Sequence, residues 1–254
     1  MKRLGEIRKN NEGYEMKIIE YNKANDIVVE FQDKYKAKIH TRYCHFKDGK
    51  VRNPYHLSVF NIGYMGEGKF KSRDETGNKT MPYIIWHSML QRCYDPYFIN
   101  KYLTYKDCIV CEEWHNFQNF AKWYEKNYYE CDNDRMELDK DILIKGNKIY
   151  SPKTCVFVPR RINTLFVKNN KNRGEYLIGV YWRNDINKFA VKCSVLNEDK
   201  KRIHLGFYDN EEEAFYRYKQ FKENYIKQVA DEYKDLIPKK LYDAMYKYEI
   251  EIND

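Results

Sequence analysis

The spacing of hydrophobic residues changes along this chain of 254 residues, and that change restricts the fold more than any other feature. Up to about residue 75, apolar and polar residues alternate over short stretches, which is the period of β-strands. From Pro82 the spacing becomes that of amphipathic helices. After residue 175 it returns to short strands, followed by one long helical stretch. We therefore expect a multidomain α+β protein.

The first 75 residues hold three short strand-like stretches at 16–21, 26–31 and 35–40, separated by turn-forming residues. Strands so close together in sequence predict a small β-barrel domain at 1–75. The polar segment 74–80 is the first expected linker.

Two helices are predicted in the middle of the chain. Apolar residues recur there at helical spacing, first at Trp86, Met89, Leu90 and Cys93, then at Trp114, Phe117, Ala121 and Tyr124. Such stripes indicate helix faces packed in a core rather than a cofactor site.

The chain carries a net charge of +8, and its distribution is uneven. Residues 142–202 contain 14 Lys and Arg against 4 Asp and Glu, whereas 203–254 contain 8 against 12. A dense basic segment is typical of proteins that bind a phosphate backbone. A solvated lysine-rich surface is the alternative.

No apolar stretch approaches the roughly 20 residues that a membrane-spanning helix needs, and the first residues do not resemble a secretory signal. We expect no membrane partner and a cytoplasmic location in a bacterial host cell. The seven cysteines, an odd number, are expected to be reduced thiols or metal ligands rather than disulfides.

The last part of the chain predicts three strands, at 178–183, 188–195 and 201–207, and a helix with Asn210 as its N-cap and Glu213 at the capping-box position. Its landmarks are Gly179–Val180, Lys188–Phe189–Ala190, Leu205–Gly206–Phe207 and Glu213–Ala214. On these residues the stretch resembles the DNA-binding domain of the APETALA/ethylene-response-factor family, whose relatives occur in nucleases of phages and mobile elements. The resemblance implies a domain at 174–254, in which a three-stranded antiparallel sheet packs on a helix and binds double-stranded DNA in the major groove.

Carried over residue by residue, the family's DNA contacts fall on two residues in each strand: Tyr181 and Arg183, Lys192 and Ser194, Arg202 and His204. Alternation within a strand independently places each pair on one face of the sheet. The other face, with Val180, Val191, Ile203 and Leu205, is expected to cover the helix. A face used for protein contacts is the alternative reading.

Residues 138–163 predict a strand, a turn, a second strand and a helix from about Pro159. The stretch resembles the HNH endonuclease motif, through Leu138–Asp139 at its opening, the segment 151–158 in its middle and Asn163 at its close. The resemblance implies a central ββα module with flanking helices at 80–167. Its implied catalytic residues are Asp139, Lys140, Asn147, Ser151 and Asn163.

In that family a histidine activates water and an Asp helps to hold one divalent metal. Here Lys140 stands at the histidine position, and a lysine with an ordinary pKa of about 10.4 is protonated at neutral pH. Asp139, Asp141 and Asn163 are candidate ligands for Mg²⁺ or Mn²⁺.

Two classes of function remain open. One is a phage-type or mobile-element endonuclease, of the homing type, that cleaves or nicks DNA. The other is a catalytically inactive DNA-binding regulator or counter-defence protein that binds DNA or a host nuclease. RNA binding is a third reading, because 25 Tyr and 13 Phe could stack on bases.

Cys108 and Cys111 have the spacing of a zinc knuckle, and Cys93 and Cys155 could complete a structural Zn²⁺ site. Buried, unliganded thiols are the alternative, because Cys93 and Cys111 lie on apolar faces.

Overall fold

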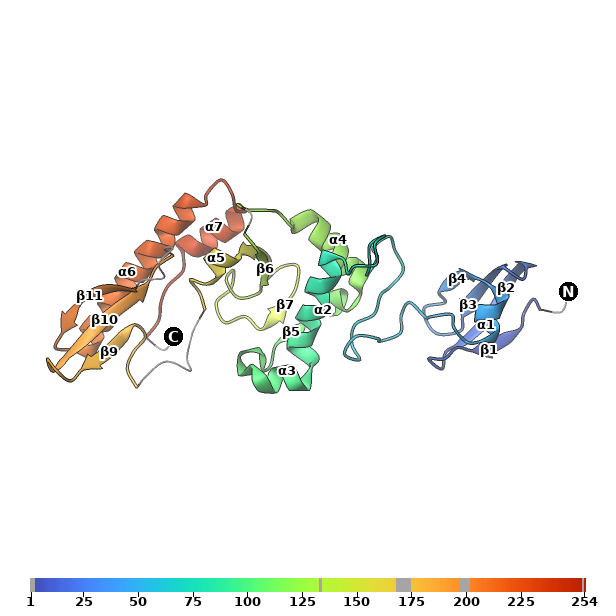
Figure 1. Cartoon of the computed structure of the whole chain (residues 1–254), viewed down its shortest axis with the longest axis horizontal. Helices are drawn as coiled ribbons and strands as arrows, with labels where there is room; N and C mark the ends of the chain where they lie inside the picture. The colour runs from blue at the N-terminus through green and yellow to red at the C-terminus, as the bar shows by residue number, and fades with distance from the viewer. Residues whose placement is uncertain (1–2, 133, 168–174, 197–201, 253) are drawn as a thin grey trace. The chain divides into compact units, whose positions relative to one another are not determined.

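The computed structural model describes residues 3–132, 134–167, 175–196, 202–252 and 254. Over these ranges the chain is a mixed α/β protein with several small sheets (Figure 1). It divides into two compact units. One consists of Met1–Lys126 with Ile149–Ser151, and the other of Asn127–Lys148 with Pro152–Asp254.

The first unit begins with an antiparallel four-stranded sheet in the order β1-β2-β3-β4. Its elements are β1 (Ile7–Lys9), β2 (Glu15–Lys23), β3 (Asp26–Phe31), β4 (Lys38–Thr41) and the short helix α1 (Tyr43–Lys47). The expected closed barrel is wrong, because each strand pairs only with its neighbours in sequence and the sheet stays open. Its apolar face is covered instead by Phe46 of α1 and by Val51, which pack with Met16, Val29 and Phe31.

From Met81 onward the first unit is mainly helical, as the spacing predicts. It contains α2 (Met81–Tyr94), α3 (Pro96–Lys101), η1 (Leu103–Tyr105), β5 (Ile109–Val110), η2 (Glu112–His115), α4 (Phe117–Asn127) and β7 (Ile149–Tyr150), which pairs with β5. Trp86, Met89 and Phe117 are fully buried, so the expected core stripes are confirmed. The indole Nε1 of Trp86 donates to the backbone oxygen of Trp114 at 2.7 Å and fixes the two segments together.

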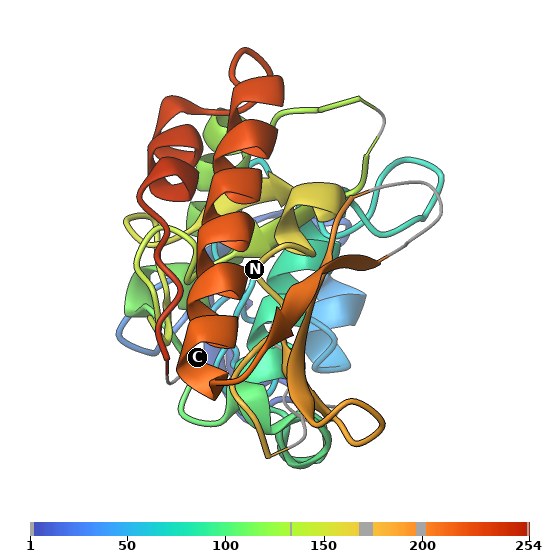
Figure 2. The same ribbon diagram turned by 90° about the vertical axis from the view of Figure 1, so that its left-hand side faces the viewer.

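Within its described residues, the second unit contains a two-stranded antiparallel hairpin, a three-stranded sheet and three helices. They are β6 (Met136–Asp139), β8 (Val156–Pro159), α5 (Arg160–Asn163), β9 (Val180–Arg183), β10 (Lys188–Ser194), β11 (Arg202–Tyr208), α6 (Glu211–Glu232) and α7 (Lys239–Tyr246). The sheet has the order β11-β10-β9, and α6 lies along one face of it (Figure 2). The expected C-terminal three-stranded antiparallel sheet and helix are confirmed. The Asn210 side chain accepts from the backbone nitrogens of Glu212 and Glu213, as the N-cap prediction requires.

The segment after α7 ties α6 to the loop between β6 and β7. Ile250 is buried against the sheet and α6, and its backbone oxygen accepts from Lys219 Nζ at 2.7 Å. Lys145 Nζ, in the loop, lies 2.8 Å from the Asp254 carboxylate and 2.8 Å from the Glu249 carbonyl oxygen. The hairpin and the sheet–helix module are thus joined within the second unit.

Two further expectations concern a linker and membrane-spanning helices. The predicted linker at 168–175 lies, except for Glu175, outside the described residues. Among the residues that are described, no helix is long and apolar enough to cross a membrane.

Candidate nucleic-acid interface and candidate metal centre

The outer face of the β9–β11 sheet collects the six residues that the sequence assigns to DNA contact. Lys192 pairs with His204 and Ser194 pairs with Arg202 across β10 and β11. On the other side of β10, Tyr181 pairs with Ala190 and Arg183 with Lys188. Paired residues share a face of a sheet. Tyr181, Arg183, Lys192, Ser194, Arg202 and His204 therefore lie together on the face turned away from α6.

The inner face carries the expected apolar residues, with one correction. Val191 is fully buried, and Val180 and Leu205 pack against the same cluster. Ile203 was expected to cover the helix, but it lies outside that cluster with 40% of its surface exposed. Its place, one residue from the start of β11, leaves it at the open end of the sheet.

A β-bulge brings a further residue, Phe207, to the outer face. The register skips between Val191, which pairs with Gly206, and Lys192, which pairs with His204, so Leu205 is the extra residue. Gly206 has a φ of 125°, in a region that favours glycine. Simple alternation would place Phe207 with Leu205 on the helix side. Instead Phe207 is 44% exposed, and its ring lies 4.5 Å from that of His204.

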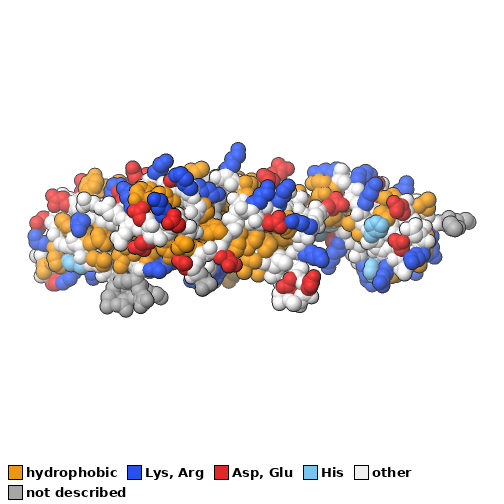
Figure 3. Space-filling model, turned by 90° about the horizontal axis from the view of Figure 1, so that it is seen from above, with side chains coloured by type: hydrophobic (Ala, Val, Ile, Leu, Met, Phe, Trp, Pro, Cys, Tyr) orange, Lys and Arg blue, Asp and Glu red, His pale blue; other side chains and the backbone are white. Residues whose placement is uncertain are grey.

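The outer face is cationic, and its cations differ in their partners. Arg183 forms two hydrogen bonds with the carboxylate of Asp185, which raises the pKa of the guanidinium above its ordinary value. Lys188 pairs with Asp209 at 2.8 Å. Lys192 Nζ lies over the ring of Tyr181, 5.0 Å from its centroid. On the side of the molecule seen in Figure 3, basic and acidic side chains are interspersed. The positions of individual charges therefore say more about a binding surface than the net charge of the chain does.

The second candidate site is at the end of β6, where Asp139 begins a tight loop. Asp139 Oδ1 accepts from the backbone nitrogens of Asp141 at 2.8 Å and Ile142 at 2.7 Å. Burial, together with the nearby Asp141 carboxylate, raises the pKa of Asp139 to about 6. The carboxylate is therefore fixed in position and only partly solvated.

Lys140 and Asn147 brace this loop. Lys140 is buried, and its Nζ lies 3.3 Å from Asp141 Oδ2. Asn147 Nδ2 donates to the Lys140 backbone oxygen at 2.7 Å. The position of Lys140 beside the Asp139 loop suits it to attract a phosphate.

Asn163, on α5, contacts a residue that the motif did not indicate. Its Nδ2 donates to Glu137 Oε2 at 2.6 Å. Glu137 and Asp139 are two residues apart on β6, so they share a face of the hairpin. Glu137 could have been found from this alternation. The amide oxygen of Asn163 and the two carboxylates supply the hard oxygen atoms that Mg²⁺ prefers.

The remaining sequence candidates are divided between the units. Ser151, Cys93, Cys108 and Cys111 belong to the first unit, and Cys155 belongs to the second. Cys93, Cys108 and Cys155 are buried. Among the described residues, no group of three or more His, Cys, Asp or Glu side chains is arranged to hold a metal ion.

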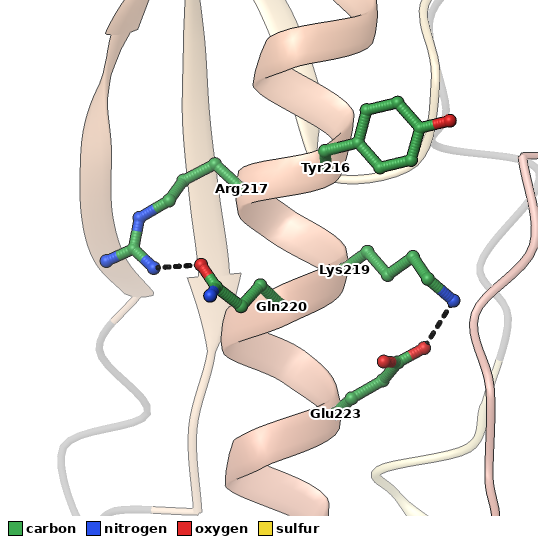
Figure 4. A pocket seen from close by; sticks show the side chains of 5 residues that line it. All are labelled: Tyr216, Arg217, Lys219, Gln220 and Glu223. Atoms are coloured by element: carbon green, nitrogen blue, oxygen red, sulfur yellow. Dashed lines mark hydrogen bonds and ion pairs between the residues drawn. The ribbon is translucent and has the colours of Figure 1, made fainter.

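A hollow of about 510 Å³ lies on the outward side of α6 and contains none of the predicted site residues (Figure 4). It is lined by Tyr216, Arg217, Lys219, Gln220 and Glu223. Its polar groups already pair with each other, Lys219 with Glu223 at 2.6 Å and Arg217 with Gln220 at 3.4 Å.

Comparisons with protein-family models, with curated proteins and with solved structures found no match to this chain.

Proposed function

We propose that this protein binds double-stranded DNA through the outer face of the β9–β11 sheet. The observation that carries the proposal is that the six residues predicted from the sequence to contact DNA share one face of the sheet. Lys188 and Phe207 lie beside them. Four cations, Arg183, Lys188, Lys192 and Arg202, lie on this face. Cationic side chains attract the phosphates of a duplex. Strands of this kind can enter the major groove of B-form DNA.

The residues of this face suit different parts of the duplex. Lys192 and Arg202, which have no carboxylate partner among the described residues, are suited to phosphate contact. Ser194 and His204 present hydrogen-bonding groups for base edges, and Phe207 presents an apolar ring for the methyl group of thymine.

Double-stranded RNA is the weaker alternative. The major groove of an A-form helix is deep and narrow, and side chains on a sheet do not reach its base edges. Stacking on single-stranded RNA needs several exposed aromatic rings close together. Phe207 is exposed on the sheet face, whereas the exposed rings of Tyr97 and Tyr216 belong to α3 and α6.

The test is fluorescence anisotropy with random-sequence duplex DNA, duplex RNA and single-stranded RNA. We expect duplex DNA to bind most tightly and the double variant Lys192→Ala/Arg202→Ala to lose about tenfold or more in affinity. Lys239→Ala, on α7, is the matched control, because Lys239 is an exposed lysine remote from the sheet face. Equal affinity of the double variant and the control would contradict the proposal.

A second candidate function, metal-dependent cleavage of the DNA backbone, is favoured by the Glu137, Asp139 and Asn163 group. Two carboxylates on one face of β6 and an amide on α5 suit one Mg²⁺ or Mn²⁺ ion. Such an ion would activate water and stabilise charge on the scissile phosphate. The residues of this chain would orient the substrate, with Lys140 attracting a phosphate oxygen and Asn147 keeping the loop in shape.

This function is tested with supercoiled plasmid, Mg²⁺ or Mn²⁺, and a gel-shift control on the same DNA. We expect nicking or cleavage by the unaltered protein, and its loss in Asp139→Ala, Asn163→Ala and Glu137→Gln. Retarded but intact plasmid would contradict cleavage. It would favour a catalytically inactive protein that regulates DNA or counters a host nuclease.

A further inference from the structure

The segment after α7 places acidic groups on Lys145, in the loop between β6 and β7. Lys145 Nζ lies 2.8 Å from Asp254 Oδ2 and 3.5 Å from Glu251 Oε1. It also donates to the Glu249 carbonyl oxygen at 2.8 Å. Among the described residues, all partners of this ammonium group therefore come from that one segment.

The segment has an anchored part and an acidic part. Ile250 is buried, and both its backbone nitrogen and its backbone oxygen are bonded to side chains of α6. The side chain of Glu251, by contrast, is 66% exposed. Asp254 is buried, but its release from Lys145 would return the carboxylate to water, which offsets much of the lost ion pair. The acidic part can therefore leave Lys145 while Ile250 stays in place.

Lys145 belongs to the loop that carries the candidate metal centre, four residues after Asp141. Its ammonium group lies 5.5 Å from the centroid of the Tyr248 ring, on the segment after α7. Burial raises the pKa of Tyr248 to about 12, and the carboxylates of Asp254 and Asp141 add to the rise. Tyr248 therefore lies where the segment and the loop meet. A DNA strand that binds at this loop would meet Lys145.

The contact joins the two parts of the sequence that are biased in charge. Lys145 belongs to the basic segment 142–202, and its acidic partners belong to the acidic segment 203–254. A carboxylate oxygen offers an ammonium group the same sign of charge and the same acceptor chemistry as a phosphate oxygen. The acidic residues therefore occupy Lys145 in the way that a phosphate of the DNA backbone would.

We propose that Lys145 is a contact for a phosphate of the DNA backbone, and that Asp254 and Glu251 form an autoinhibitory contact that this phosphate must displace. This inference rests on the proposed DNA-binding function and adds a regulated contact outside the β9–β11 sheet.

The test is fluorescence anisotropy with random-sequence duplex DNA over a series of salt concentrations. In Asp254→Asn we expect the affinity to rise about threefold or more, because Lys145 no longer gives up a carboxylate when it binds a phosphate. The slope of log affinity against log salt should become steeper by up to about 1, since the freed lysine releases a counterion on binding.

Glu249→Gln is the matched control. It removes the same charge from the same segment, but the backbone oxygen of Glu249, not its carboxylate, contacts Lys145. We expect it to change neither the affinity nor the salt slope. The gain of Asp254→Asn should vanish without Lys145, so Lys145→Gln and Lys145→Gln/Asp254→Asn should bind equally. The double variant leaves neither charge without its partner, and by itself it should bind no more tightly than the unaltered protein. Thermal melting checks that each variant is folded.

The outcomes separate the two proposals. Equal gains in Asp254→Asn and Glu249→Gln would reveal a general effect of charge and overturn the autoinhibitory contact. An unchanged affinity in Asp254→Asn, or a gain that persists without Lys145, would overturn it too. In each of these cases the DNA-binding proposal stands as long as the unaltered protein binds duplex DNA through the sheet face. Failure of both the unaltered protein and Asp254→Asn to bind any duplex would overturn both proposals.

Discussion

Lys192 on β10 lies opposite His204 on β11, although the next pair along the ladder joins Val191 to Gly206. The skipped residue is Leu205, so the two halves of β11 present opposite alternations. Before the bulge Arg202 and His204 face outward, and after it Phe207 does. The bulge thus adds an aromatic ring to a cationic face and directs Leu205 toward the helix.

Replacement of Lys192 by alanine tests the electrostatic part of this face. The ammonium group is exposed and has no acidic partner within the described chain, so its loss should weaken binding to all DNA sequences about equally. Affinity titrations over a series of salt concentrations should show the slope of log affinity against log salt reduced by about 1. The melting temperature should not change.

Ser194→Ala is the control for this measurement, because Ser194 lies on the same strand and face but carries no charge. It should leave the salt slope unaltered. If the slope is the same in Lys192→Ala as in the unaltered protein, Lys192 does not contact a phosphate.

The sheet face was predictable because it depends on local alternation, whereas the bulge was not. A bulge is set by the pairing of two strands, and no single strand shows it. The same limit explains the incorrect barrel: strand rhythm predicts strands at 26–31 and near 38–41, but only the observed pairing shows that the sheet stays open. The contact of Arg183 with Asp185 was not predictable either, because a turn residue gives no periodic signal.

Gly179 is expected to be intolerant of a side chain. Its φ of 81° is strained for other residues, and an added Cβ would overlap the ring of Tyr218 on α6. Gly179→Ala should lower the free energy of unfolding by about 1–3 kcal/mol, through backbone strain and overpacking. Chemical denaturation followed by circular dichroism measures this change.

Gly146→Ala separates the cost of backbone strain from the cost of overpacking. Gly146 has a similar φ of 77°, but nothing lies within 4 Å of an added Cβ. It should carry the backbone cost alone and destabilise less than Gly179→Ala. Equal losses in the two variants would show that contact with Tyr218 contributes nothing.

The candidate metal centre was predictable only in part. The resemblance named Asp139 and Asn163, which the structure places on β6 and α5. The partner of Asn163 is Glu137 on β6, which the resemblance did not name. The contacts of Lys145 with Glu249 and Asp254 join residues more than 100 positions apart, and no motif or period links such residues.

The segment after α7 is expected to stabilise the second unit through Ile250. This side chain is 4% exposed in the cluster between α6 and the sheet, and its backbone nitrogen donates to Glu223 Oε1 at 2.8 Å. Ile250→Ala should cost about 2–5 kcal/mol in the free energy of unfolding. Ile252→Ala, two residues later at an exposed site, should change it by no more than about 0.5 kcal/mol. Equal effects in denaturant titrations would contradict a buried anchor at Ile250.

Asp231 links α6 to α7 and should make stability depend on pH in the acid range. Its two carboxylate oxygens accept from the hydroxyl groups of Tyr242 at 2.9 Å and Tyr246 at 2.7 Å, and these bonds lower the pKa of Asp231 below its ordinary value. A carboxylate whose pKa is lowered by folding stabilises the folded state above the unfolded pKa of about 3.9, and the contribution is lost as pH falls through the folded pKa. The double variant Tyr242→Phe/Tyr246→Phe should therefore have a lower melting temperature than the unaltered protein at neutral pH. This gap in melting temperature should narrow under acid conditions. Melting curves at several pH values measure the gap, and Tyr216→Phe, an exposed tyrosine of α6, should show none. A gap that stays constant into the acid range would mean that the tyrosines act by packing and not through the charged form of Asp231.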